Sequence, residues 1–111
     1  MLDYDASDDW LDVGFGNQDE PSRAVALNDH ITVYTNSAIS RVTRVTLGEY
    51  ARLLMVNETE FTTLREEDPW VIEDVMLLLQ RPPVNRLLHV TDPEAFIARV
   101  LAPSIASLFD A

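Results

Sequence analysis

The sequence predicts an α+β domain in which an N-terminal four-stranded antiparallel β-meander packs against C-terminal helices. Short stretches of alternating polarity fill residues 10–47, apolar residues at helical spacing follow, and the change falls near Gly48. Neither half can bury its apolar face alone. We therefore expect a single domain over residues 1–111, with residues 1–47 as the meander and residues 48–111 as its helical cover.

Four segments alternate in the way that half-buried strands do. Asn36-Ser37 fits a tight hairpin turn, because Asn tolerates the left-handed conformation. The last segment changes phase along its length, so we expect a β-bulge near Arg41. One face of such a sheet is apolar and has to be covered. The predicted strands are residues 10–15, 24–27, 31–35 and 39–47.

The second half carries helix signals. Asp68 is a typical N-cap residue, Pro69 suits the first helical turn, and Pro82-Pro83 ends the stretch. A capping box at residues 91–94 predicts a last helix over residues 93–101, and shorter helical turns are expected at residues 50–54, 57–64 and 105–109. The apolar stripe of the central helix contains Ile72, Val75, Met76 and Leu79, widened by Val71 and Leu78.

Charge and composition exclude several classes of function. Nineteen acids face eight arginines, lysine is absent, and the formal net charge is −11. Such a surface repels phosphates, so we expect no direct nucleic-acid binding and no membrane binding, and the acids favour a basic partner. Without cysteine the chain has no disulfide or thiolate chemistry, and its acidic start is unlike a secretory signal. We expect a cytoplasmic protein.

The acids of the first twelve residues invite a calcium interpretation. Counted from Asp3, the sixth and twelfth positions hold Asp8 and Gly14 where a calcium loop needs glycine and glutamate. A solvated acidic edge, in which Asp5 or Asp9 caps a turn, explains the pattern better. The sequence therefore predicts no metal site.

Catalytic chemistry has no recognisable set of residues in this sequence. His30 and His89 have no second ligand or nucleophile at a suitable spacing. Asp9 and Asp12 could be drawn as a carboxylate pair for hydrolysis, but nothing in the sequence creates a cleft around them. We expect a protein that is not an enzyme, with no catalytic residue and no cofactor.

Aromatic and leucine side chains are the candidate interface residues. Trp10, Tyr34 and Trp70 could anchor an interface, although core packing of both tryptophans is the favoured interpretation. The helices carry more apolar side chains than a four-stranded sheet can cover, Leu77 and Leu78 among them. We therefore expect a homodimer or another protein partner.

Two stretches of the first half resemble a known family. They are Tyr4-Asp5-x-x-x-Asp9-Trp10-Leu11-x-Val13 and Val42-x-x-Val45-Thr46-Leu47-x-x-Tyr50-Ala51-Arg52. Both are similar to parts of domain-of-unknown-function family 2283, although Asn36-Ser37 and Arg44 stand where the family has Asp-Gly and Gly. The resemblance extends to Val56 and implies a small β-meander without established activity. Some relatives look like one half of a toxin–antitoxin-type pair, which implies a protein partner.

Three functions follow from these observations. The first is a non-enzymatic protein-interaction or regulatory module, such as an antitoxin-like protein, that buries helical leucines and a tryptophan against a basic target. The second is an acidic, nucleic-acid-mimicking inhibitor of a DNA-binding protein, which needs acids spaced like phosphates along one face. The third is a small enzyme with a pocket between sheet and helices, for which the sequence names no convergent polar groups.

Overall fold

The protein has an α+β fold built from two antiparallel sheets and two α-helices. The computed structural model describes residues 2–15, 22–56, 58–82 and 84–101, and all elements below lie within them. The first sheet contains β1 (Leu2–Asp5), β2 (Trp10–Gly14), β3 (Ser22–Ala26), β4 (Ile31–Asn36) and β5 (Val42–Gly48). The second half contains α1 (Tyr50–Met55), β6 (Thr59–Glu60), α2 (Pro69–Leu79), β7 (Leu88–Asp92), β8 (Ile97–Val100) and 3-10 turns at Leu64–Glu66 and Val84–Arg86.

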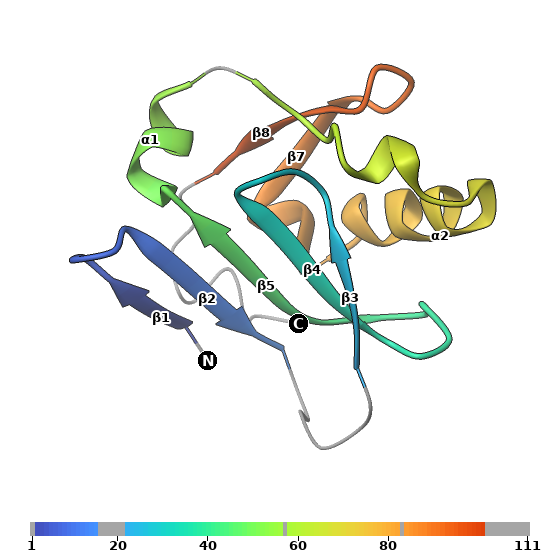
Figure 1. Cartoon of the computed structure of the whole chain (residues 1–111), viewed down its shortest axis with the longest axis horizontal. Coiled ribbons are helices and arrows are strands. Elements are labelled where there is room, and N and C mark those ends of the chain that lie inside the picture. Colours follow the sequence, from blue (N-terminus) through green and yellow to red (C-terminus); the bar gives the residue numbers. More distant parts are fainter. Residues whose placement is uncertain (1, 16–21, 57, 83, 102–111) are drawn as a thin grey trace.

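The first sheet keeps the four predicted strands but not their predicted order. Its order is β1-β2-β5-β4-β3, so β5 lies between β2 and β4, and β1 adds a fifth strand (Figure 1). The predicted four-stranded meander is therefore wrong. Because β2 ends at Gly14 and β3 begins only at Ser22, the connection is longer than a tight hairpin turn, and β3 can pair elsewhere.

The inner face of this sheet is apolar in two rows that cross the strands. One row joins Leu11, Leu47 and Ile31, and the other joins valines of four strands. All of these side chains are at most 2 % exposed. Since side chains alternate along a strand, the residues between them form an outer face that contains Trp10, Asp12, Thr32, Tyr34, Arg44 and Thr46.

The hairpin between β4 and β5 differs from its prediction. The turn is longer than Asn36-Ser37, because Asn36 Oδ1 accepts hydrogen bonds from the backbone N–H groups of Ser40 and Arg41 at 2.9 and 3.1 Å. The register shift lies at Thr43, since Tyr34 pairs with Arg44 and Thr35 pairs with Val42. The bulge is thus real but lies two residues beyond Arg41.

Two of the predicted helices are replaced by extended structure. The segment 57–64 contains β6, and the segment 93–101 contains β8. Asp92 Oδ1 does accept the Ala95 backbone N–H at 3.1 Å, as a capping residue would, but Phe96 adopts a φ of 59° and the chain turns into β8. The residues of the predicted capping box therefore form the turn of the β7–β8 hairpin and do not begin a helix. The predicted piece at residues 105–109 lies outside the described residues.

The central predicted helix is confirmed as α2, and it helps to cover the first sheet. Figure 1 shows α2 and the second sheet together with the five-stranded sheet. Buried apolar residues from the inner face, α1, α2 and the second sheet form one hydrophobic cluster. The two sheets are also joined by Asn28, whose Nδ2 donates to Thr59 Oγ1 and to the Glu60 carbonyl, both at 3.1 Å. Neither helix of the described chain has the length and apolar content to cross a membrane.

Candidate functional site

The five predicted interface residues fall on two surfaces and in the core. Trp10 and Tyr34 lie on the outer face of the five-stranded sheet, whereas Trp70 and Leu77 lie on the outside of α2. Leu78 is only 8 % exposed and belongs to the hydrophobic core, so its contact with a partner stays a prediction. Core packing of the tryptophans is also wrong, since Trp10 is 44 % and Trp70 is 53 % exposed.

Trp10 lies against the neighbouring strand β5. Its cross-strand partner is Gly48, and a Cβ atom on that glycine would lie 3.2 Å from the indole ring. The absence of a side chain at residue 48 therefore lets one side of the indole pack on the sheet. The indole is 44 % exposed, and the cross-strand partner of Trp10 in β1 is Asp5.

On the same outer face, the Arg44 side chain contacts both Asp12 and Tyr34. Its Nε donates to Asp12 Oδ1 at 2.7 Å, its Nη2 pairs with Asp12 Oδ2, and its guanidinium carbon lies 5.2 Å from the Tyr34 ring centroid. The hydrogen bond from Arg44 to Asp12 raises the pKa of Arg44, so the guanidinium stays charged. Asp12 thus belongs to an ion pair that links the side chains of strands β2 and β5.

The outside of α2, which we call the α2 outer face, contains Trp70, Glu73, Asp74 and Leu77. Trp70 and Leu77 are seven residues apart, so two helical turns place them on the same side. The guanidinium carbon of Arg23 lies 5.3 Å from the Trp70 ring. The opposite side of the helix is buried by Val71, Val75, Met76, Leu78 and Leu79.

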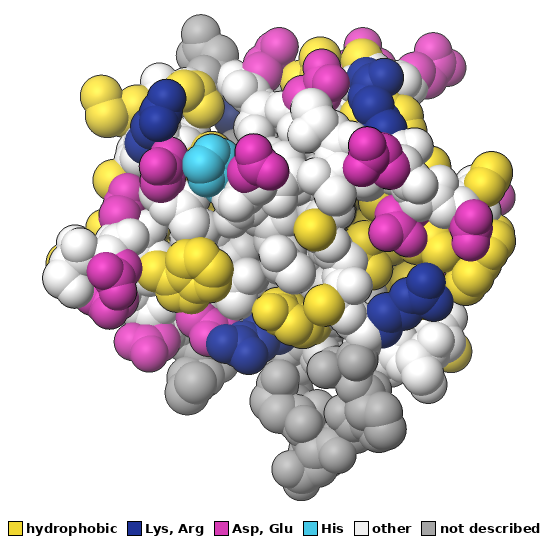
Figure 2. Space-filling model, in the orientation of Figure 1, with side chains coloured by type: hydrophobic (Ala, Val, Ile, Leu, Met, Phe, Trp, Pro, Cys, Tyr) yellow, Lys and Arg dark blue, Asp and Glu magenta, His cyan; other side chains and the backbone are white. Residues whose placement is uncertain are grey.

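Acidic side chains lie near both surfaces. Figure 2, in the same orientation as Figure 1, shows acids along the edge over β1 and β2 and again on the side of α2, with few charges between them. The hydrophobic side chains on this face lie in separate groups, and one group of adjoining side chains lies on the side of α2 (Figure 2). A partner at either surface therefore meets aromatic groups with acids nearby and one arginine against a ring, Arg44 at Tyr34 and Arg23 at Trp70.

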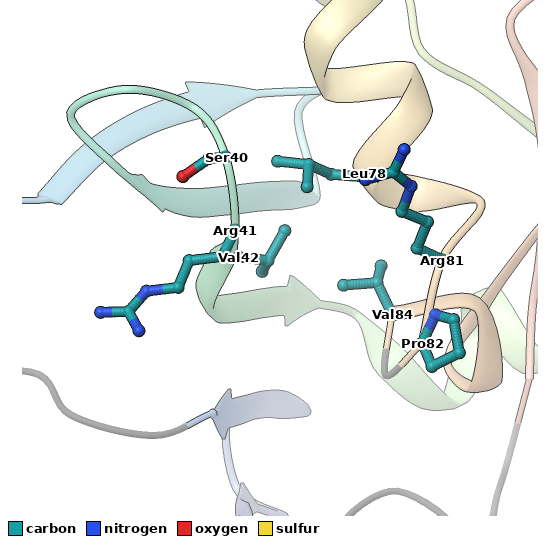
Figure 3. A pocket seen from close by; sticks show the side chains of 7 residues that line it. All are labelled: Ser40, Arg41, Val42, Leu78, Arg81, Pro82 and Val84. Carbon is teal, nitrogen blue, oxygen red and sulfur yellow. The ribbon is translucent and has the colours of Figure 1, made fainter. Parts of the chain in front are cut away.

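A hollow of about 130 Å³ lies between the β4–β5 turn and the end of α2. Figure 3 shows Arg81 running back beside Leu78, whereas Arg41 points away from the hollow. Among the described residues, the lining includes two arginines and no acid. An apolar base is formed by Val42, Leu78 and Val84, and the rim by Ser40, Arg41, Arg81 and Pro82.

The two histidines lie in different parts of the fold, His30 half-buried and His89 exposed. His30 Nε2 lies 3.8 Å from Glu49 Oε2, next to the end of β5. His89 lies on β7 and lines a second shallow hollow together with Gln80 and Asn85. Among the residues that the structure describes, no group of three or more His, Asp or Glu side chains could hold a metal ion.

Asp9 has a structural role that the sequence does not reveal. Its carboxylate accepts a hydrogen bond from the Tyr4 hydroxyl at 2.7 Å and from the Ala51 backbone N–H at 2.9 Å. The Tyr4 hydrogen bond, followed by that from Ala51, lowers the pKa of Asp9. The side chain thereby caps α1 from the β1–β2 hairpin. Asp5 accepts hydrogen bonds from the backbone N–H and hydroxyl of Ser7, so the expected turn cap is present at Asp5.

Comparisons with known proteins give no relative: no family model, no curated protein and no solved structure matches the chain. The resemblance to domain-of-unknown-function family 2283 stays a prediction. Tyr4, Asp9, Tyr50 and Ala51, which belong to the two stretches that carry the resemblance, meet at the contact between the hairpin and α1. The function has to be inferred from the surfaces described above.

Proposed function

We propose that this protein is a non-enzymatic protein-binding module that uses the α2 outer face. The observation that carries the proposal is the exposure of Trp70 (53 %) and Leu77 (48 %) on one side of a helix whose other side is buried. Large apolar side chains that are exposed beside polar residues mark protein-interaction sites. Tryptophan is also enriched at the centres of protein interfaces. A partner seated on this face would bury both side chains.

The partner that fits this face best is a basic segment with apolar side chains. Acids at positions 66–68 and 73–74 flank Trp70, and the whole chain carries a net charge of −11. Complementary charge accelerates association and selects against wrong partners. A second copy of the chain fits less well, because a two-fold interface places each patch of acids opposite the same patch.

This mode of binding supports a regulatory role, including that of an antitoxin-like protein, because such a protein acts by covering a surface of its target. Mimicry of nucleic acid is a separate prediction that needs a continuous row of acids. The largest groups of acids lie at positions 3–12 and 58–74, which belong to different elements. The α2 outer face is therefore the better-supported site.

The proposal can be tested by selecting ligands from a random peptide library with the immobilised full chain. We expect enriched peptides to combine Lys or Arg with large apolar residues. Trp70→Ala and Leu77→Gln should each weaken the selected peptides by about tenfold, as truncation of interface anchors does. Trp10→Ala removes a similarly exposed tryptophan from another surface, so it should leave the affinity within about twofold.

Three results would contradict the proposal. Selected peptides without basic residues would exclude charge complementarity as the basis of recognition. Loss of binding with Trp10→Ala alone would move the site to the outer face of the sheet. A dimer in sedimentation experiments that dissociates in Leu77→Gln would make a second copy of the chain the occupant of this face.

A further inference from the structure

We propose that the hollow at the end of α2 binds a ligand with a short apolar body and a carboxylate, and that Arg81 is the partner of the carboxylate. This site is separate from the α2 outer face and does not depend on the proposed function. It rests on three features of the hollow: its size and apolar base, its charge, and the hydrogen bonds that the last carbonyl groups of α2 already accept.

The size of the hollow suits a small branched or cyclic group. Its volume is about 130 Å³, which is close to the roughly 150 Å³ of an engineered cavity that binds benzene. Val84 is 1 % exposed, and Val42 and Leu78 are each 8 % exposed, so a ligand would meet a base of already packed side chains. Because the hollow is open to solvent on one side, an aliphatic group of a few carbons would lose part of its contact with water without opening the core.

The charge of the hollow is opposite to that of the molecule as a whole. Of the residues that the structure describes, Arg41 and Arg81 line it and no acid does, and only Arg81 runs along the hollow, since Arg41 points away (Figure 3). Arg44, Arg52 and Arg65 each pair with an acid, whereas none of the ion pairs between described residues includes Arg81. A guanidinium group is well suited to a carboxylate because it offers parallel N–H donors.

The negative end of the α2 dipole would normally disfavour an anion at this place. Its last carbonyl groups, however, already accept hydrogen bonds from groups other than the Arg81 side chain. The Gln80 side chain donates to the Met76 carbonyl at 3.0 Å, and the Arg81 backbone N–H donates to the Leu78 carbonyl at 3.2 Å. Asn85 Nδ2 donates to the Gln80 carbonyl at 3.4 Å. The guanidinium of Arg81 is therefore not needed as a helix cap.

Such a carboxylate could belong to a free small acid or to the C-terminal residue of a peptide. The first probe is 3-methylbutanoate, compared with the neutral 3-methylbutanamide. The second is acetyl-Gly-Gly-Leu with a free carboxylate, compared with the same peptide as its C-terminal amide. Methyl NMR spectra of the full chain report on the base of the hollow directly, through the signals of Val42, Leu78 and Val84.

We expect saturable shifts of these three methyl signals with one of the two acids, at dissociation constants of about 1 mM for so small a ligand. The matching amide should bind at least about tenfold more weakly, because it lacks the charge-assisted hydrogen bonds. The tighter of the two acids identifies the source of the carboxylate. Absence of saturable shifts with both acids at tens of millimolar would overturn the proposal, as would equal binding of acid and amide.

Arg81→Gln tests the role assigned to the guanidinium and leaves an exposed position polar. The substitution should weaken binding of the carboxylate ligand by about tenfold and bring its affinity close to that of the amide. The matched control is Arg99→Gln, which removes an exposed arginine from β8, outside the lining of the hollow. Equal weakening by both variants would show that only the net charge matters, and the site would then be rejected. An unchanged amide NMR spectrum of each free variant verifies its fold.

Discussion

Asp9 shows how one carboxylate links separate parts of this chain. It accepts hydrogen bonds from Tyr4 in β1 and from Ala51 in α1, and its own backbone carbonyl accepts the Tyr50 N–H at 3.1 Å. The same contact raises the pKa of Tyr4, because the hydroxyl donates its proton to Asp9. The charged form of Asp9 is therefore favoured in the folded chain.

This contact predicts a pH-dependent effect of Asp9→Asn. Because folding lowers the pKa of Asp9, its stabilisation is present above the unfolded pKa of about 3.9 and is lost as the pH falls through the lower folded value. In urea unfolding, we expect the variant to have a lower free energy of unfolding than the parent at pH 7. The two proteins should have equal free energies of unfolding at a pH below the folded pKa of Asp9. A difference between parent and variant that does not change with pH would contradict this.

The Asp12–Arg44 pair predicts only a modest contribution to stability. The side chains are 21 % and 41 % exposed, so solvent screens their attraction. A double-mutant cycle with Asp12→Asn and Arg44→Gln should give a coupling free energy below about 1 kcal/mol, measured by urea unfolding. A coupling above about 2 kcal/mol would indicate that the pair is shielded from water, as buried pairs are.

At the scale of elements, α2 combines a buried and an exposed side within three consecutive leucines. Successive residues of a helix are separated by about 100°, so Leu77, Leu78 and Leu79 cannot all face the core. Leu79 is fully buried, Leu78 nearly so, and Leu77 is half exposed. The helix thus presents Leu77 beside the acids of the α2 outer face.

Alanine substitutions at Leu77 and Leu79 should differ sharply in their effect on the free energy of unfolding. Leu79→Ala should lower the free energy of unfolding by about 2–5 kcal/mol, because it leaves a cavity in a packed core. Leu77→Ala should change it by less than about 0.5 kcal/mol, since alanine keeps the helix propensity and no cavity forms. Both values come from urea unfolding monitored by circular dichroism. Similar losses for the two variants would mean that Leu77 is buried as well.

At the scale of the whole molecule, negative charge opposes folding. The chain carries a net charge of −11, and compaction brings these charges together. Salt shortens the screening length from about 10 Å at 0.1 M to about 3 Å at 1 M. We expect the melting temperature to rise by several degrees between low salt and about 0.5 M NaCl.

A variant with more negative charge serves as the control for this salt effect. Arg99→Glu makes the net charge more negative by two at an exposed position of β8. The variant should melt at a lower temperature than the parent in low salt and approach it in high salt. If salt lowered the melting temperature of both proteins, local ion pairs would outweigh the overall repulsion.

Local patterns determined much of the secondary structure. The alternation of apolar residues predicted β2, β3, β4 and β5, because burial of one sheet face selects every second residue. Asp68, Pro69 and Pro82 predicted α2, and the helix does begin at Pro69, although the Asp68 side chain makes no capping hydrogen bond. The composition alone indicated the acidic surface that surrounds both exposed tryptophans.

Only the tertiary structure decided the strand order, the second sheet and the position of the exposed residues. β5 pairs with β2 across a separation of more than thirty residues, and the Asp9 cap of Ala51 spans 42. The same Asp92-Pro93 chemistry can begin a helix or close a hairpin turn, and pairing of β8 with β6 and β7 selected the hairpin. Such choices depend on partners that are distant in sequence, which local spacing cannot specify.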